Sequence, residues 1–263
     1  MTRRFSATPR WVLLPAAVGA LLILLPLVGM LLRIDWAHLG ELLTSEPSLA
    51  ALWLSLRTAV VSTVLCVVLG CPLALVLARS TARGLTVFRS LVLLPLVLPP
   101  VVGGIALLYT FGRTGFLGRP LGALGVDIAF STAAVVLAQT FVAMPFLVFA
   151  VEGALRSADR RSETAAASLG ASPWQIFRLV TVPLTAPGIA AGAVLCFARA
   201  LGEFGATITF AGSFPGVTRT LPIASYLAMN SDPDTAIALA LVLLAVSLSV
   251  LLALRDRWLP GTV

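Results

Sequence analysis

Two charged residues interrupt an otherwise apolar stretch near the end of the sequence, and their spacing allows them to interact. Arg199 and Glu203 lie four residues apart in FARALGEFGATITFAG, so a helix would place them on one face. Charged side chains inside a membrane span are costly, and they usually face the bundle interior or a water-filled path. The planar guanidinium of Arg199 suits a tetrahedral oxyanion as it suits phosphate. Arg199, Glu203 and Thr207 are therefore candidates for a translocation path or gate, and the alternative is an ion pair that only fixes helix packing.

A second pattern occupies residues 163–183, which read ETAAASLGASPWQIFRLVTVP between two apolar stretches. It predicts a short amphipathic helix, a break at Gly170, and a second short helix. Gly170 can adopt the left-handed conformation that ends a helix. Ser172, Pro173 and Gln175 have the spacing of a helix start, with a hydroxyl cap, a proline at the first position and Gln at the third. Two capped helices crossing at a glycine would form a rigid knob for a partner, and the alternative is a loop that merely connects two spans.

Long apolar stretches make up most of the chain. Hydrophobic residues account for 59% of the sequence and charged residues for 11%, far from the balance of a soluble domain. Helices need about 20 apolar residues to cross a bilayer, and backbone groups in lipid must bond internally. We predict six transmembrane helices, at 11–32, 58–78, 90–111, 131–151, 187–211 and 235–254. The prediction is an all-α membrane protein whose domain, 11–254, lies between the tails 1–10 and 255–263.

Prolines in the middle of the third and fourth of these spans bear on the shape of the helices. Pro95, Pro99 and Pro100 fall in the third and Pro145 in the fourth. Each removes an intrahelical hydrogen bond and is expected to bend its helix. Such bends could serve a gate or could simply improve helix packing.

Arginine alone sets the expected orientation, because the sequence has 18 arginines and no lysine. Twelve arginines lie in the N-terminal tail, the loop after the second span, the loop 152–186 and the C-terminal tail, against four in the other loops. The positive-inside rule therefore places both termini and the 152–186 loop in the cytoplasm. The net charge of +7 is explained by this topology and by anionic lipid, without nucleic acid.

The residues that usually build enzyme sites are scarce or scattered. Cys66, Cys71 and Cys196 all fall inside predicted spans, and His38, the only histidine, lies in an outer loop. We interpret the cysteines as small apolar residues and predict no metal site and no catalytic cluster. A phosphate-binding loop of the Gly-x-x-x-x-Gly-Lys-Ser type cannot occur without lysine, so we expect ATP to be bound by another protein.

The 163–183 pattern resembles the cytoplasmic coupling loop of ABC importer permeases, in which Glu-Ala-Ala, three residues and Gly precede a conserved Pro. Ala165, Ala166, Gly170, Val180, Val182 and Pro183 are in register with that motif. At its head, Thr164 falls at the Glu position and Glu163 one residue early, which leaves open which side chain supplies the acidic contact. The resemblance implies a type I ABC importer permease fold with both termini inside. The ATPase-coupling loop residues implied are Glu163, Thr164, Ala165, Ala166, Gly170, Ser172, Pro173, Trp174, Phe177 and Pro183.

Three further features narrow the resemblance to permease subunits of molybdate importers. They are the FARALGEFGATITFAG segment, a Phe-Pro-Gly loop at 214–216, and Thr220-Leu221-Pro222. Sulfate and thiosulfate permeases share the Arg-Ala-x-Gly-Glu core and are the alternative. The resemblance implies a bacterial plasma-membrane protein that works as a homodimer with two cytoplasmic ATPase subunits and an extracytoplasmic substrate-binding protein. It implies no cofactor in this chain, with ATP bound by the ATPase subunits. A secondary transporter is a less favoured alternative, because no second copy of the 163–183 pattern is present.

Overall fold

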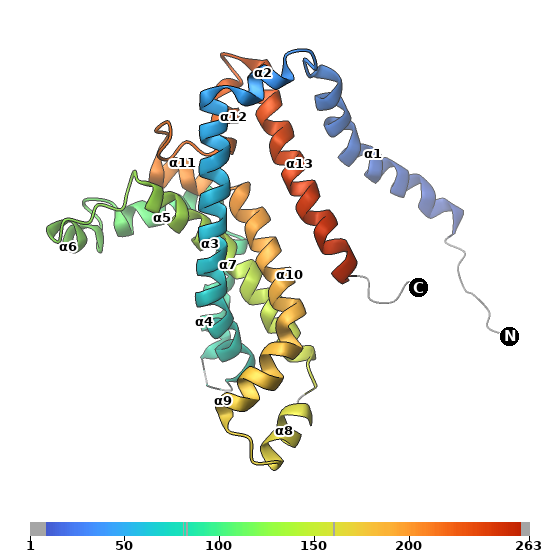
Figure 1. Ribbon diagram of the computed structural model, residues 1–263, viewed down its shortest axis with the longest axis vertical. Coiled ribbons are helices and arrows are strands. Elements are labelled where there is room, and N and C mark those ends of the chain that lie inside the picture. The colour runs from blue at the N-terminus through green and yellow to red at the C-terminus, as the bar shows by residue number, and fades with distance from the viewer. Residues whose placement is uncertain (1–8, 81, 83, 160, 259–263) are drawn as a thin grey trace.

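The described part of the chain is entirely helical. The computed structural model describes residues 9–80, 82, 84–159 and 161–258, and none of these forms a strand (Figure 1). The long helices are α1 (Arg10–Arg33), α3 (Glu46–Arg79), α7 (Thr132–Ser157), α10 (Val182–Leu201) and α13 (Pro233–Trp258). The shorter elements are α2 (Leu39–Thr44), α4 (Leu85–Leu93), the 3-10 turn η1 (Leu94–Leu96), α5 (Pro100–Phe111), α6 (Gly118–Ala123), α8 (Arg161–Ser168), α9 (Pro173–Ile176), the π-helical turn η2 (Phe177–Thr181), α11 (Gly205–Ala211) and α12 (Leu221–Ala228). The all-α prediction is confirmed.

The number of membrane crossings depends on how one bent pair of helices is counted. Within the described residues, five helices are long and apolar enough to span a bilayer, and α4–η1 with α5 makes a sixth only if the pair is one span. The prediction of six spans is compatible with this count and stays a prediction. Helix α13 runs on to Trp258, so the start of the predicted 255–263 tail is helical. Residues 1–8 and 259–263 of the two predicted tails lie outside the described residues.

The predicted third span, 90–111, is wrong as one continuous helix. The chain bends by 111° between Leu85–Leu96 and Pro100–Phe111. Pro99 is extended, with φ −54° and ψ 129°, because a residue that precedes a proline is pushed out of the helical region. Pro100 then begins α5, at a position where its missing N–H costs nothing. The expected bend at these prolines is thus a sharp break between two helices.

Three other predicted spans differ from the structure. The fourth, predicted as 131–151, continues as α7 to Ser157, so the predicted 152–186 loop begins as helix. The second begins at Glu46 instead of residue 58, because α3 continues past the apolar stretch through the exposed Arg57. The fifth, predicted as 187–211, is not one helix either. It starts earlier, at Val182, ends at Leu201, and is followed by the separate helix α11. Gly202, at the end of α10, and Glu203 lie in the break between the two helices.

Three helices, α3, α7 and α10, form the core of the subunit. Their contact is built largely from small side chains, including Ala59, Cys66, Ala143, Cys196 and Ala200, all of which are fully buried. Small residues let helix backbones approach closely, which is the usual basis of helix association in membranes. Cys66 and Cys196 point their thiols at backbone carbonyls, as the interpretation of the cysteines as packing residues requires.

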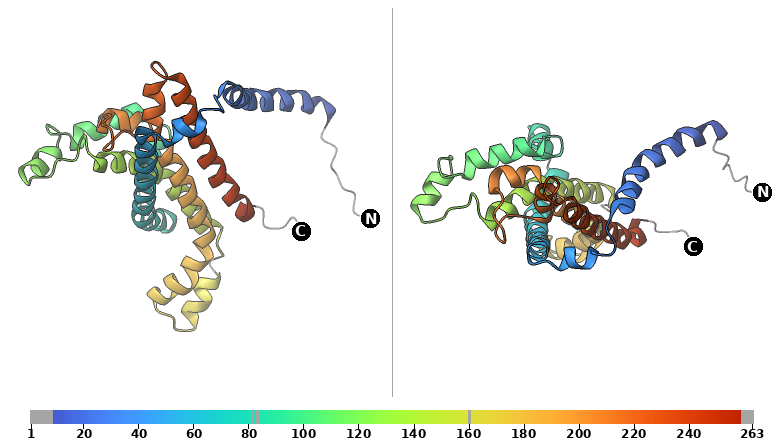
Figure 2. Two further views of the ribbon diagram at one scale, coloured as in Figure 1. Left: turned by 45° about the horizontal axis from the view of Figure 1, so that its top comes forward. Right: turned by 90° about the horizontal axis from the view of Figure 1, so that it is seen from above.

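The remaining elements lie around this core. In Figure 1, α8 and α9 form the lower end, while α2, α12 and the start of α13 gather at the upper end. Figure 2 shows α1 extending away from the bundle, and none of its apolar window is buried. Two short helices, α5 and α11, pack against each other beside α7. The fold therefore separates a knob at one end from a cluster of broken helices further along the bundle.

Candidate functional site

The knob at the lower end is formed by α8 and α9, and a left-handed glycine ends the first of these helices. Gly170 has φ +82°. Its N–H donates to the carbonyl of Ala167, and the N–H of Ala171 donates to the carbonyl of Ala166. This pair of hydrogen bonds is a Schellman motif, which satisfies carbonyls that the helix end leaves unpaired. The predicted break at Gly170 is confirmed.

The second helix begins with the predicted capping box. The Ser172 hydroxyl accepts a hydrogen bond from the Gln175 N–H at 3.3 Å, and the Gln175 side chain accepts one from the Ser172 N–H at 2.7 Å. Pro173 occupies the first helical position, where no N–H is needed. Caps on both sides of the turn fix the angle between α8 and α9 without help from another protein. We call residues 161–181 the docking turn.

A feature that the sequence did not indicate follows α9. Residues Phe177–Thr181 form a π-helical turn, in which the N–H of Val182 donates to the carbonyl of Phe177. Pro183 has no N–H, and its ring clashes with the carbonyl four residues before it, so the turn ahead of it widens. The wider turn carries Thr181 inward, where its side chain is 3% exposed.

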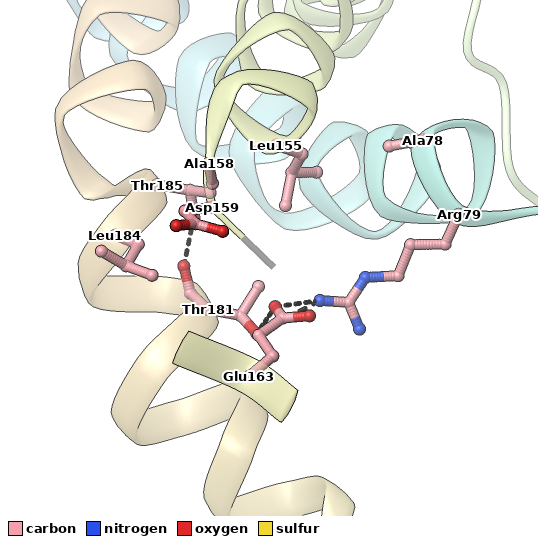
Figure 3. Close-up of a pocket in the computed structure, with 9 residues that line it drawn as sticks. All are labelled: Ala78, Arg79, Leu155, Ala158, Asp159, Glu163, Thr181, Leu184 and Thr185. Carbon is pink, nitrogen blue, oxygen red and sulfur yellow. Dashed lines mark hydrogen bonds and ion pairs between the residues drawn. The ribbon is translucent and has the colours of Figure 1, made fainter. Parts of the chain in front are cut away.

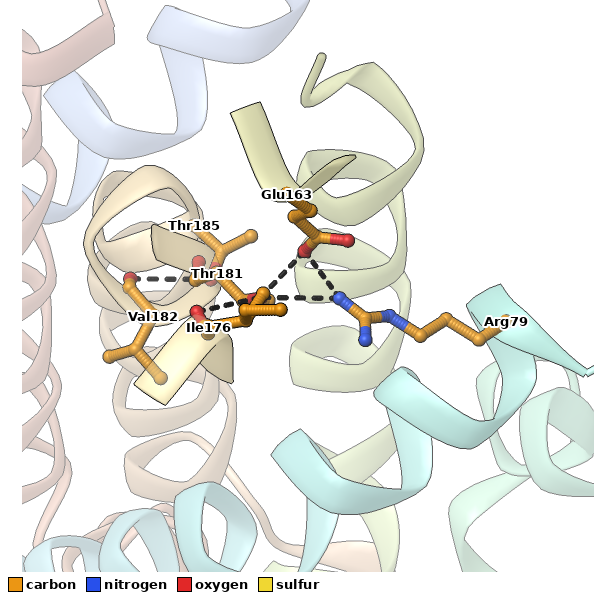
Figure 4. A network of polar contacts seen from close by, with 6 residues as sticks. All are labelled: Arg79, Glu163, Ile176, Thr181, Val182 and Thr185. Atoms are coloured by element: carbon orange, nitrogen blue, oxygen red, sulfur yellow. Dashed lines mark hydrogen bonds and ion pairs between the residues drawn. The ribbon is translucent and has the colours of Figure 1, made fainter. Parts of the chain in front are cut away.

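Glu163 belongs to a hydrogen-bond network that joins the docking turn to the core. Its Oε1 atom accepts hydrogen bonds from Arg79 at 2.5 Å and from the Thr181 hydroxyl at 2.6 Å (Figure 4). Arg79 also donates to the Thr181 oxygen at 3.2 Å. Figure 3 shows the Glu163 carboxylate facing Arg79 at the last turn of α3. The sequence left open whether Glu163 or Thr164 supplies an acidic contact. In the structure, the Glu163 carboxylate contacts Arg79 of α3 and Thr181 of η2.

The outer side of the docking turn is apolar and exposed. The side chains of Leu169, Trp174 and Leu179 are 89%, 65% and 68% exposed. The rings of Trp174 and Phe177 contact each other, with their centroids 5.8 Å apart. The other predicted coupling residues are distributed as follows: Thr164, Ala165, Gly170, Ser172, Pro173 and Pro183 are exposed, and Ala166 is half-buried. One face of the turn is therefore bound to the chain, and the other is open to a partner.

The predicted pair of Arg199 and Glu203 is present, although a helix break lies between the two residues. An Arg199 guanidinium nitrogen lies 2.6 Å from Glu203 Oε2. The Glu203 side chain is 1% exposed and that of Arg199 is 26% exposed. The other Glu203 oxygen, Oε1, accepts a hydrogen bond of 2.8 Å from the N–H of Ala206, in the first turn of α11. Glu203 therefore joins the end of α10 to the start of α11, which favours a structural role for the pair.

Thr207, the third path candidate, lies on α11 and is completely buried. Its hydroxyl has no hydrogen-bond partner among the described residues. Helix α11 packs closely on α5: a Cβ atom at Gly104 would lie 2.8 Å from the carbonyl oxygen of Ala206. The two broken helices are therefore in backbone contact, which requires glycine at position 104.

Sequence reasoning missed two members of the Glu163 network. Arg79 lies 84 residues before Glu163 and entered the prediction only as a positive charge at the end of a span. Thr181 lies within the recognised pattern but was given no role. A sign was available for Arg79, because the expected topology puts the end of its span on the same side as the coupling-like loop.

Comparisons with known proteins agree over most of the chain. Residues 66–260 match the family described as "Binding-protein-dependent transport system inner membrane component". The molybdenum transport system permease protein ModB of Mycobacterium tuberculosis is 57% identical over 254 residues, which cover 97% of this chain and 96% of that protein. The protein of the same description from Escherichia coli is 40% identical over 219 residues, covering 83% of this chain and 96% of the relative.

A solved structure resembles the fold. The structure of a bacterial ABC transporter involved in the import of the acidic polysaccharide alginate superimposes with a TM-score of 0.74 at 20% identity. The match covers 93% of this chain and 92% of that one. At this identity the likeness concerns the fold alone.

Proposed function

The chain belongs to the family of binding-protein-dependent transport system inner membrane components, and we propose that it is the permease subunit of an ATP-driven importer of molybdate. It is a multi-pass membrane protein with the type I ABC importer permease fold, and it is not itself the ATP-hydrolysing subunit. The observation that carries the substrate assignment is the identity of 57% with a molybdenum permease along 97% of the chain. An oxyanion substrate also fits the arginine at the α10–α11 break, Arg199, which is paired with Glu203.

The docking turn is the part that we assign to ATPase coupling. Its apolar outer side, with Leu169 and Trp174, supplies aromatic and aliphatic surface of the kind that dominates protein interfaces. Its inner side is fixed to α3 through Glu163. A push on the turn by an ATPase subunit would therefore be passed to the core helix rather than absorbed by a loose loop. We assign two cytoplasmic ATPase subunits, a second copy of this chain and an extracytoplasmic binding protein to the complex.

The orientation follows from arginine distribution and from the position of the docking turn. Both termini and the turn are cytoplasmic in this proposal, so the turn lies where ATP is available. Single cysteines at Ser80 and Ser157, in a background lacking the three native cysteines, should resist an impermeant thiol reagent in intact cells. Cysteines at Ser45 and Ser231 should be labelled. Labelling of Ser157 from outside would reject the proposed orientation.

The path through the membrane is assigned to the region of the broken helices. Arg199, Glu203 and Thr207 lie at the α10–α11 junction and on α11, which packs against α5. Glu203 and Thr207 are buried and Arg199 is partly exposed, which is compatible with a gate that opens when the helices separate. We assign Arg199 the role of attracting the oxyanion only in such an open state, because in this structure its charge is already paired.

Transport in a reconstituted system tests the function. The chain would be placed in liposomes with its ATPase subunit and binding protein, and uptake of labelled molybdate would be measured with and without ATP. We expect ATP-dependent uptake that excess tungstate or molybdate inhibits more strongly than sulfate. Stronger inhibition by sulfate or thiosulfate would show that the substrate is one of these sulfur oxyanions and not molybdate. Uptake without ATP would favour a secondary transporter.

A further inference from the structure

A second buried carboxylate lies outside the docking turn and the broken helices. Glu152, near the end of α7, is 1% exposed. Its Oε1 atom lies 2.9 Å from the guanidinium of Arg89 on α4 and 2.9 Å from that of Arg156, one turn further along α7. The Arg156 Nε also donates to it at 3.1 Å. Two guanidinium groups share one carboxylate, so the cluster carries one surplus positive charge in a fixed position.

Both arginines open onto a cavity of about 220 Å³ at the ends of α3, α4 and α7. The cavity is lined by Leu77, Ser80, Ala82, Leu85, Thr86, Arg89 and Arg156. Its volume is several times the roughly 30 Å³ that a water molecule occupies in the liquid. An arginine offers five N–H donors, and Glu152 uses only one nitrogen of Arg89 and two of Arg156 in the described residues. The remaining donors, with the hydroxyl groups of Ser80 and Thr86, suit an anion with several oxygens, and phosphate is the common one.

The surface beside the cavity is apolar and belongs to α4. Val87, Phe88 and Leu91 are 65%, 47% and 60% exposed, while Arg89 on the same short helix turns inward to Glu152. Helices with one apolar face and a basic residue on the other are typical of the lipid headgroup region, where the apolar face contacts acyl chains. A free phosphate ion would make no contact with this apolar surface. A phospholipid would occupy both the cavity, with its head group, and the helix face, with its acyl chains.

We propose that this cavity binds the phosphate group of an anionic phospholipid, whose acyl chains lie along Val87 and Leu91 of α4. The cavity lies beside the base of the docking turn, because its lining residue Ser80 directly follows Arg79, which pairs with Glu163 of the turn. With the orientation proposed above, the lipid belongs to the cytoplasmic leaflet, where anionic lipid attracts basic clusters. The lipid would join α4 to the end of α7 and so support the base of the docking turn. The binding itself does not depend on the substrate or on transport.

Lipid binding to the purified full-length chain in detergent tests this proposal. Thermal unfolding would be followed with added phosphatidylglycerol, with phosphatidylcholine, and with inorganic phosphate alone. Phosphatidylglycerol should raise the melting temperature more than phosphatidylcholine does, and it should bind at least about fivefold more tightly. If inorganic phosphate reproduces the whole effect, the cavity is a site for a free oxyanion and the lipid assignment is overturned.

The key variant replaces Arg89→Met, Glu152→Met and Arg156→Leu together. Apolar replacement of an ion-pair triad around a buried charge is often neutral or stabilising. Here only Glu152 is buried, and the two arginine side chains are 34% and 52% exposed, so this protein should fold. It should lose the preference for phosphatidylglycerol. Thr86→Val, which leaves the triad intact, should weaken that preference, and Arg178→Gln, an exposed arginine of the docking turn, should not change it. An unchanged preference in the folded triple variant, or in Thr86→Val if the triple variant does not fold, would refute the site.

Discussion

Arg79 and Glu163 are 84 residues apart in the sequence, yet their side chains form an ion pair of 2.5 Å that holds the docking turn against α3. The pair is partly exposed, at 41% and 24% of the two side chains, and Thr181 shares the same carboxylate oxygen. The contact therefore contributes modestly to stability, but it connects α8 directly to the core helix α3. Its importance should appear in coupling more than in folding.

Replacing Glu163 should separate these two effects. Glu163→Gln removes the charge that Arg79 contacts, and the global free energy of unfolding should fall by only about 0.5–1 kcal/mol, as for exposed ion pairs. Backbone amides of α8 should exchange with deuterium faster, and ATP hydrolysis should respond less to the loaded binding protein. Thr181→Val should have a similar, smaller effect, and Glu46→Gln, at the start of α3, is the matched control. Unchanged exchange in α8 would show that the network does not hold the turn.

The left-handed glycine of the docking turn predicts a graded response to substitution. Gly170→Pro fixes φ near −65° where the turn needs +82° and removes the N–H that bonds to Ala167, so ATPase coupling should be lost. Gly170→Asn should retain most of the coupling, because asparagine tolerates the left-handed region. Membrane insertion should be normal in both proteins, as judged by the yield from washed membranes. Full ATPase stimulation in Gly170→Pro would show that the docking turn takes no part in coupling.

Replacing Arg199 and Glu203 singly and together should give non-additive losses of stability. Arg199→Met leaves a charged carboxylate 1% exposed and unpaired, which should cost about 3 kcal/mol or more. Glu203→Gln keeps an acceptor for the Ala206 N–H and should cost about 1 kcal/mol. The double variant should be more stable than the sum predicts by about 1–3 kcal/mol, because the two residues are in contact.

Molybdate uptake by the double variant then tests whether Arg199 also contacts the transported anion. If the pair is only structural, the double variant should transport better than Arg199→Met alone. If Arg199 contacts the anion, uptake should stay absent although the protein folds. Strictly additive losses of stability would contradict a direct pair.

The contact between α5 and α11 should not tolerate a methyl group. Gly104→Ala would place a Cβ atom 2.8 Å from the carbonyl oxygen of Ala206, so the two helices must separate. We expect a loss of about 1–3 kcal/mol, typical of overpacking, together with altered transport. Gly153→Ala on α7 meets no atom within 4 Å and should be neutral or stabilising. Thermal unfolding of both variants in detergent decides this, and equal melting temperatures would contradict the close approach.

His38 and Asp35 form an exposed pair after the first long helix, with His38 Nδ1 2.7 Å from the carboxylate. This hydrogen bond raises the pKa of His38 above its usual 6.5, and the bond to His38 lowers the pKa of Asp35 below 3.8. The His38 contribution is complete below pH 6.5 and is lost as the pH rises through its raised pKa. The Asp35 contribution is present above pH 3.8 and is lost as the pH falls through its lowered pKa. The pair is thus strongest between these limits, and Asp35→Asn should lower the His38 pKa in an NMR titration.

Local patterns in the sequence were sufficient for the features that depend on neighbouring residues. The all-helical class, the glycine break at 170 and the capping box at Ser172 are confirmed, because caps and left-handed turns are made by residues within four or five positions of one another. The spacing of Arg199 and Glu203 likewise indicated the ion pair that the structure contains. The same reasoning failed at 90–111, where the sequence is apolar throughout but the backbone breaks, and at 187–211, where the helix ends beside the charged pair.

Only the tertiary structure decided which distant residues meet. Arg79 pairs with Glu163, and Arg89 with Glu152, across gaps that no periodicity in the sequence spans. A hydropathy pattern records where apolar residues lie along the chain, but not which helix faces which, since lipid and a neighbouring helix are equally apolar partners. The choice is made by close packing of small residues in α3, α7 and α10, and that packing places these charges within reach of each other.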